Sequence, residues 1–211
     1  MARGFAIQLL GSGLSAAKHH EDALSVKEAR LSLMRRLGAS VEDVFIAQGN
    51  LANSYQFLGR LEEAMSLRRD VYSGCLKLNG EVHEETLRAA NNYAYALVTV
   101  KRFEEAKALM RKMMPVARRV AGDHNENTLQ LRANYAIALY TNDGATLDDL
   151  REAVTTLEDA ERTARRVLGG GQPTAVGMEQ SLRQARAVLS AREGDLEPLR
   201  AAVEAMAPGD A

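Results

Sequence analysis

Three asparagines recur at a fixed spacing, and their amide side chains are the groups best suited to recognise another molecule. Asn50, Asn92 and Asn134 lie 42 residues apart, and each precedes a large residue and an alanine. An amide both donates and accepts hydrogen bonds, so a row of amides suits the free N–H and C=O groups of an extended peptide. Asparagine is a mediocre helix former, so three at one helical register need a reason. We predict a peptide-binding row, and the alternative is hydrogen bonding to backbone groups between adjacent helices.

Four further polar residues lie near this row. Asn53 and Asn91 are expected to assist the three asparagines. Arg88 and Arg132 fall on the same predicted helices, from which they would reach a carboxylate of a ligand. Exposed rim charges are the alternative interpretation of the two arginines, because most charged side chains on helices lie in solvent.

Glycines mark the ends of the elements that must position these residues. Gly38, Gly80, Gly122 and Gly169 are separated by 42, 42 and 47 residues, and each follows a Lys or Arg three residues earlier. A cation in the last turn and a glycine just beyond it are typical of a helix C-terminus. Self-similarity at such a period indicates a repeat array. Helix capping therefore explains the cations before any ligand is invoked.

Each repeat reads as a pair of helices. The first helix begins with an acidic residue or proline at matching places, and the asparagine row lies within it. Those starting positions are Glu42, Glu84, Glu126 and Pro173. The second helix keeps a fixed length, since 16 residues separate its early alanine from the closing glycine; those alanines are Ala64, Ala106 and Ala153. The third of these repeats carries five extra residues between its two helices, in a loop that includes the polar, turn-prone residues 141–144.

These patterns divide the chain into a repeat array, 1–192, and a terminal segment, 193–211. The approximate units are 3–38, 41–80, 83–122 and 125–169, followed by a capping helix over 173–192. A break is expected at 193–195, then a short helix and a frayed tail. Ala, Leu, Glu and Arg dominate and aromatic residues are 5%, so the class is all-α.

Composition disfavours several kinds of partner. The formal net charge is −1, whereas nucleic-acid-binding proteins usually carry a basic excess. No apolar run approaches the roughly 20 residues that cross a bilayer. The single cysteine, Cys75, cannot form an internal disulfide, which favours a reducing compartment and a cytoplasmic location. Residues 1–17 faintly resemble a signal or transit peptide, and this is the less favoured alternative because they also fit the repeat.

No grouping of residues predicts catalysis, a metal or a cofactor. His19 and His20 are adjacent, so they face different directions on a helix. Cys75 has only Lys77 near it, and the glycines at 169–171 lack the lysine of a phosphate-binding loop. We therefore expect a protein without enzymatic activity.

The repeat resembles a known family. Gly80, His83, Thr86 and Leu87 form the Gly-x-x-His-x-x-Thr-Leu pattern of tetratricopeptide repeats of the kinesin light chain type. The resemblance implies a right-handed α-solenoid whose first helices line a concave surface, where the asparagine row would clasp a peptide. It concerns the repeat type and not a motor subunit, because the usual His-Pro is missing and there is no room for a long heptad region.

The expected function is a protein-protein interaction scaffold that binds an extended peptide or partner tail in the groove. The alternative is a structural, self-assembling repeat module, since the degenerate unit that begins at Pro173 and the short last helix would cover the core poorly. A protein or peptide is the expected partner, without nucleic acid or membrane.

Overall fold

The computed structural model describes residues 9–14 and 19–206, with side chains described as far as Gly194. Regular secondary structure in these residues is entirely helical, which confirms the all-α class. The chain divides into two compact units, residues 1–102 and 103–211, which are described separately. The sequence predicted one array over 1–192.

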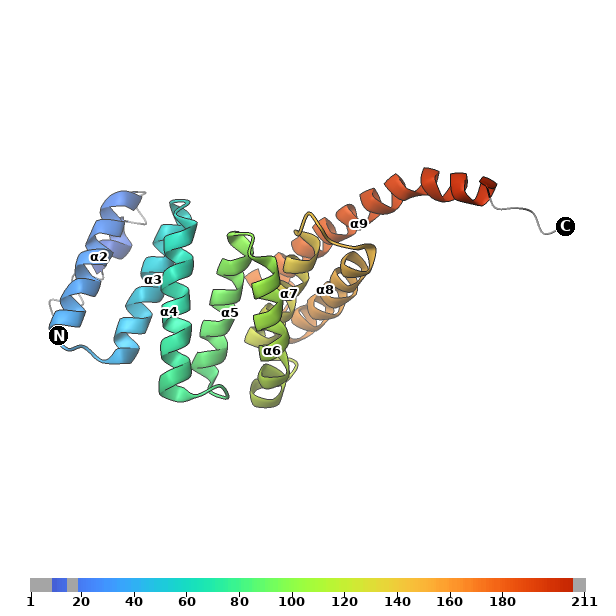
Figure 1. Ribbon diagram of the computed structural model, residues 1–211. Coiled ribbons are helices and arrows are strands. Elements are labelled where there is room, and N and C mark those ends of the chain that lie inside the picture. The colour runs from blue at the N-terminus through green and yellow to red at the C-terminus, as the bar shows by residue number, and fades with distance from the viewer. Residues whose placement is uncertain (1–8, 15–18, 207–211) are drawn as a thin grey trace. The chain divides into compact units, whose positions relative to one another are not determined.

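Unit 1 is a series of helical hairpins (Figure 1). A short helical stretch at residues 9–14 precedes four helices, α2 (His20–Arg36), α3 (Val41–Phe57), α4 (Leu61–Asn79) and α5 (Glu84–Thr99). Helix α2 packs against α3, α3 against α4, and α4 against α5. Short turns join them, so α3 and α5 run the same way and α4 runs antiparallel to both. The prediction for the N-terminal residues 1–17 falls largely outside the described residues.

Unit 2 repeats this arrangement with a longer last helix. Its helices are α6 (Phe103–Ala121), α7 (Glu126–Tyr140), α8 (Leu147–Leu168) and α9 (Pro173–Met206). Neighbours along the chain pack together, and α9 also contacts α7. Pro115 lies inside α6, and the side chains of Met110 and Met113 are completely buried core residues.

The helix ends follow the predicted signals. Gly80 and Gly122 have φ of 79° and 87°, a left-handed conformation that glycine adopts without steric cost. At the other ends, the Ser40 hydroxyl accepts a hydrogen bond from the Asp43 amide, at 3.1 Å. Thr146 and Asp149 form a reciprocal capping box that starts α8 after the inserted loop.

Alanine and threonine at repeated positions let neighbouring helices approach closely. Ala52, Ala94 and Ala136, which follow the large residue after each asparagine, are all completely buried. The Thr86 hydroxyl of the family pattern donates to the Cys75 carbonyl at 3.2 Å, and this bond ties α5 to α4. Small side chains at these positions are therefore needed for the hairpins to pack.

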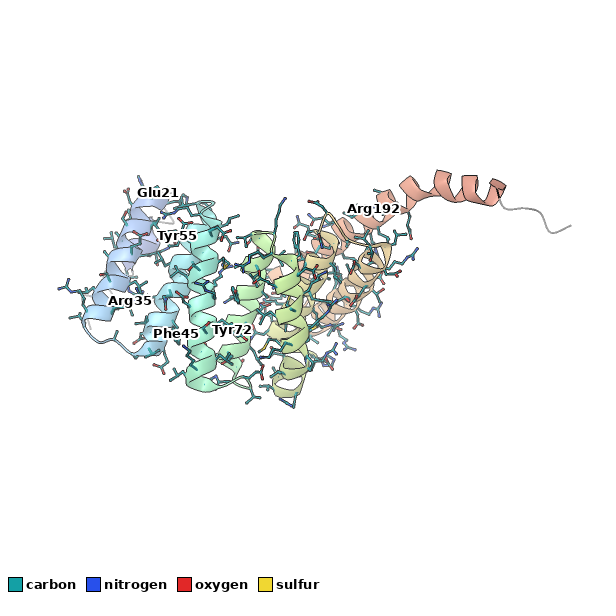
Figure 2. All side chains as sticks on the ribbon, in the orientation of Figure 1. Glu21, Arg35, Phe45, Tyr55, Tyr72 and Arg192 are labelled. Carbon is teal, nitrogen blue, oxygen red and sulfur yellow. The ribbon has the colours of Figure 1, made fainter. Side chains whose placement is uncertain are left out.

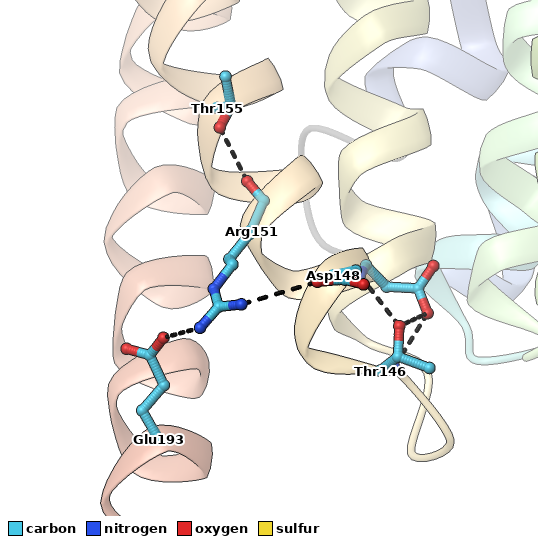
Figure 3. A network of polar contacts seen from close by, with 6 residues as sticks. Thr146, Asp148, Arg151, Thr155 and Glu193 are labelled. Carbon is cyan, nitrogen blue, oxygen red and sulfur yellow. Dashed lines mark hydrogen bonds and ion pairs between the residues drawn. The ribbon is translucent and has the colours of Figure 1, made fainter.

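Helix α9 continues through the predicted break at 193–195. Glu193 accepts from Arg151 Nη2 of α8 at 2.9 Å, and Asp148 also lies beside this arginine (Figure 3). This contact holds α9 against α8 at the point where Gly194 was expected to interrupt the helix. A single glycine in a helix costs only about 1 kcal/mol, which such contacts offset. The final segment, 207–211, lies outside the described residues.

Tyr55 links α3 to α2 and gives a spectroscopic prediction. Its hydroxyl donates to Glu28, and burial followed by this hydrogen bond raises the pKa of Tyr55 to about 12. Because its folded-state pKa is raised, its contribution to stability is complete below the ordinary value near 10 and is lost as pH rises through 12. Tyr55→Phe should remove a late ionisation, near pH 12, from an ultraviolet absorbance titration.

The matched control is Tyr93→Phe, on α5, whose ring stacks on Tyr72 at 5.9 Å between centroids. We expect this variant to keep the late ionisation. Retention of that ionisation in Tyr55→Phe would show that the Glu28 contact does not raise the pKa of the Tyr55 hydroxyl.

Candidate peptide-binding groove

Helices α3, α4 and α5 of unit 1 enclose a groove of about 410 Å³. Four of the seven predicted site residues line it: Asn50 and Asn53 from α3, and Arg88 and Asn92 from α5. Helix α4 contributes the remaining wall, which the sequence did not assign to a site. The repeat spacing therefore brings part of the predicted row onto one surface.

The groove has an apolar middle between two polar ends. The apolar lining comes from Phe45, Ile46, Val71 and Ala89. Because α3 and α5 run parallel and α4 antiparallel, Glu42, Asn79 and Glu85 gather at one end, near the helix starts of α3 and α5. Asn53 and Arg68 lie toward the other end. Such a surface offers hydrogen-bonding groups on both sides of a hydrophobic patch.

Arg68 of α4 is the functional candidate that the sequence did not reveal. Its Nη2 donates to the Asn53 side-chain oxygen at 2.9 Å, and its guanidinium lies 5.8 Å from the centre of the Tyr95 ring. Burial lowers the pKa of Arg68. Within the described part of the chain no carboxylate forms an ion pair with it. Its charge is thus partly desolvated and uncompensated, which suits contact with an anionic group.

The other titratable groups in the groove are less available. Arg88 is paired with Glu85 on its own helix. Cys75 lies in the floor, where burial raises the pKa of its thiol. A thiol with a raised pKa stays protonated at neutral pH and is a weak nucleophile. The groove is therefore suited to binding and not to cysteine chemistry.

Two glycines shape the walls. A Cβ on Gly74 of α4 would lie 2.1 Å from Cζ of Phe45, so only glycine lets the Phe45 ring fold against α4. Phe45 lies toward the start of α3 in Figure 2. Gly49, one helical turn further along α3, lines the groove, and a Cβ there would meet nothing within 4 Å.

The remaining predicted site residues occupy other environments. Asn91 is 5% exposed and is not among the residues that line the groove. Arg132 is 8% exposed and its Nη2 donates to Asp159 of α8 at 2.6 Å, which gives it a structural role inside unit 2. Asn134 is half-buried on α7, also in unit 2, and remains an untested member of the row.

A metal site needs several ligating side chains close together, and a membrane span needs a long apolar helix. No group of three His, Cys, Asp or Glu side chains comes together in a way that would hold a metal ion, as far as the structure describes the chain. Within the described helices, none has the length and apolar character needed to cross a membrane.

Comparison with known proteins defines the class. Residues 43–115 match the sequence profile of the tetratricopeptide repeat family. This stretch includes α4, α5 and the Gly80–Leu87 pattern, so the predicted repeat type is confirmed. No curated protein sequence matches the chain.

Solved structures give the same fold. One form of a Podosopora anserina protein, described as a kinesin light chain with nearly identical TPR-like repeats, has a TM-score of 0.71 at 19% identity, covering 94% of this chain and 92% of that one. BtubC of P. vanneervenii has a TM-score of 0.68 at 15% identity, covering 97% and 81%. Residues 43–115 therefore contain tetratricopeptide repeats, and the chain has the fold of kinesin light chain-like repeat proteins.

A more distant similarity is to the Rap protein in complex with Competence and Sporulation Factor. The TM-score is 0.55 at 16% identity, with 90% of this chain and 54% of that chain covered. At this identity the similarity concerns the fold alone.

Proposed function

We propose that this protein is a non-enzymatic interaction module that binds an extended peptide segment of a partner in the α3–α5 groove. Tetratricopeptide repeats are generally protein-protein interaction modules, which supports the broad class. The observation that carries the specific proposal is the exposure of Asn50, Asn53 and Asn92 around an apolar groove. Exposed amides in that position can hydrogen-bond the main chain of a peptide whose side chains fill the apolar middle.

The Rap complex supports the idea that this kind of fold can hold a partner, since it was solved with Competence and Sporulation Factor. The uncompensated charge of Arg68 favours a ligand that brings an acidic group to that end of the groove. The free, buried Cys75 supports placing the module in a reducing compartment such as the cytoplasm.

The surface of α9 favours this function over self-assembly by stacking. The helix buries Ala175, Met178 and Ala185, whereas Arg183 and Arg186 are exposed. Exposed charged side chains on this helix suit contact with water. End-to-end stacking onto this helix would bury those charges.

Selection of peptides on the protein provides the test. A random peptide library displayed on phage yields binders, and fluorescence polarisation then measures their affinity. In the double variant Asn50→Ala, Asn92→Ala we expect affinity to fall about 30-fold, because two main-chain hydrogen bonds are lost at roughly 1 kcal/mol each. Both side chains are exposed, so circular dichroism and Tm should stay unchanged.

Asn134→Ala, measured separately, tests whether the row reaches unit 2. The proposal predicts a smaller loss for this variant than for the double variant, since Asn134 is outside the groove of unit 1. Failure to select any binder, or full affinity in the double variant, would overturn the proposed function.

A further inference from the structure

Gly49 is the groove residue that packing does not explain. Glycine is the weakest helix former after proline, and Gly49 lies well inside α3. Gly74 of α4 has a structural reason, because any Cβ there would collide with the Phe45 ring. No such contact exists at Gly49, where the space beyond Cα is open.

The open space belongs to the groove. Gly49 lies between Phe45 and Ile46 on one side and Asn50 and Asn53 on the other along α3. It therefore marks the boundary between the apolar middle and the amide end. A bare stretch of helix at this boundary permits closer approach of a ligand than any residue with a side chain would.

The equivalent positions in the later repeats are buried and do not line an open space. The residues 42 and 84 positions after Gly49 are Asn91 and Ala133, and both are buried. Phe45 differs from its counterparts in a related way, since Leu87 and Leu129 are buried whereas Phe45 is half-buried. The bare wall of α3 is thus absent at the equivalent positions of α5 and α7.

We propose that Gly49 is the specificity-determining position of the groove, where it leaves room for one bulky apolar side chain of the bound peptide. This inference rests on the proposed function and adds the class of residue that the groove selects. The anchor side chain packs against Phe45, Ile46 and Ala89, while the peptide main chain next to it reaches Asn50 and Asn92. Size at this one peptide position then governs affinity.

The experiment fills the space and asks whether smaller peptides become preferred. The probe is the tightest peptide selected on the wild-type protein, together with versions in which each apolar residue is changed to alanine. Gly49→Leu should weaken the parent peptide about 20-fold. Changing the anchor residue of the peptide to alanine should lower its affinity for the wild type about 10-fold. Its affinity for Gly49→Leu should fall at most about 2-fold, because the filled space no longer holds the anchor.

Gly49→Ala tests whether a loss of affinity could come from misfolding, since alanine is the better helix former and should not destabilise α3. We expect its Tm to rise by a few degrees while affinity for the parent peptide falls about 3-fold. Gly177 of α9 provides the matched control, because it is also helical and a Cβ there meets nothing within 4 Å. Gly177→Ala and Gly177→Leu should leave affinity unchanged.

The outcomes separate this inference from the proposed function. If peptides bind and Asn50→Ala, Asn92→Ala weakens them, but Gly49→Leu does not, the groove binds peptides and Gly49 has no part in selection. Equal losses on anchor trimming in the wild type and Gly49→Leu would also overturn the inference. Absence of any selected peptide overturns the proposed function itself.

Discussion

Replacing Ala136 with leucine should lower the free energy of unfolding by about 3 kcal/mol, the upper part of the range for overpacked cores. Ala136 is completely buried on α7, the helix that packs against α6, α8 and α9 within unit 2. Leucine adds three carbons where no space is open, so side chains must leave preferred rotamers or the helices must separate. Urea unfolding followed by circular dichroism measures the change.

The control is Ala187→Leu, the same substitution at an exposed position of α9. It should change the free energy of unfolding by no more than about 0.5 kcal/mol, as surface substitutions usually do. Similar losses in the two variants would show that close helix packing at Ala136 does not determine stability.

This alanine illustrates how much of the fold was accessible from the sequence. The triplets of asparagine, large residue and alanine predicted both the helix and its buried face, because equivalent residues recur in equivalent environments. The glycines and acidic first turns predicted helix boundaries, such as the end of α4 just before Gly80 and the start of α5 at Glu84. Local signals of this kind are present in each repeat separately.

The candidate site was predicted only in part, because repetition fixes register and not exposure. Asn50 and Asn92 reach the groove as expected, yet Asn91 is buried beside Asn92. Adjacent residues on a helix point about 100° apart, so a neighbour in sequence need not share a face. The prediction for Asn91 did not take this angle between neighbouring side chains into account.

Arg68 and Gly49 were missed for another reason. Both lack counterparts of the same type one repeat later, where Met110 and Asn91 stand. Residues that recur in every repeat reflect what the fold requires, whereas a residue found in one repeat can reflect what a single groove adds. The signal for Gly49 was a glycine inside a helical pattern, and the signal for Arg68 was a cation on a predominantly buried helix face.

Arg132 was predicted as a ligand contact, and the structure places it in an ion pair with Asp159 inside unit 2. Its side chain is only 10% exposed, while its partner Asp159 is 58% exposed. Arg132→Ala should lower the free energy of unfolding by about 2 kcal/mol. Most of this loss comes from the packing of the arginine stem, because the remaining carboxylate is hydrated and its unpaired charge costs little.

The control for this variant is Arg183→Ala, whose ion pair with Glu179 spans 3.9 Å with a largely exposed arginine. It should cost less than about 0.5 kcal/mol. The proposed groove of unit 1 also predicts that peptide affinity is unaffected in Arg132→Ala, since this residue lies in the other unit. Loss of affinity without loss of stability would restore Arg132 as a ligand contact.

The same pair makes stability depend on pH in a defined direction. The hydrogen bond from Arg132 holds the pKa of Asp159 below its ordinary value of 3.8. A lowered folded-state pKa means that the contribution is present above pH 3.8 and is lost as pH falls through the folded value. The difference in unfolding free energy between wild type and Asp159→Asn should therefore be constant near neutrality and shrink below pH 3.8. A difference that stays constant to the lowest pH at which the protein folds would mean that packing alone, and not the charge of Asp159, joins α8 to α7 at this point.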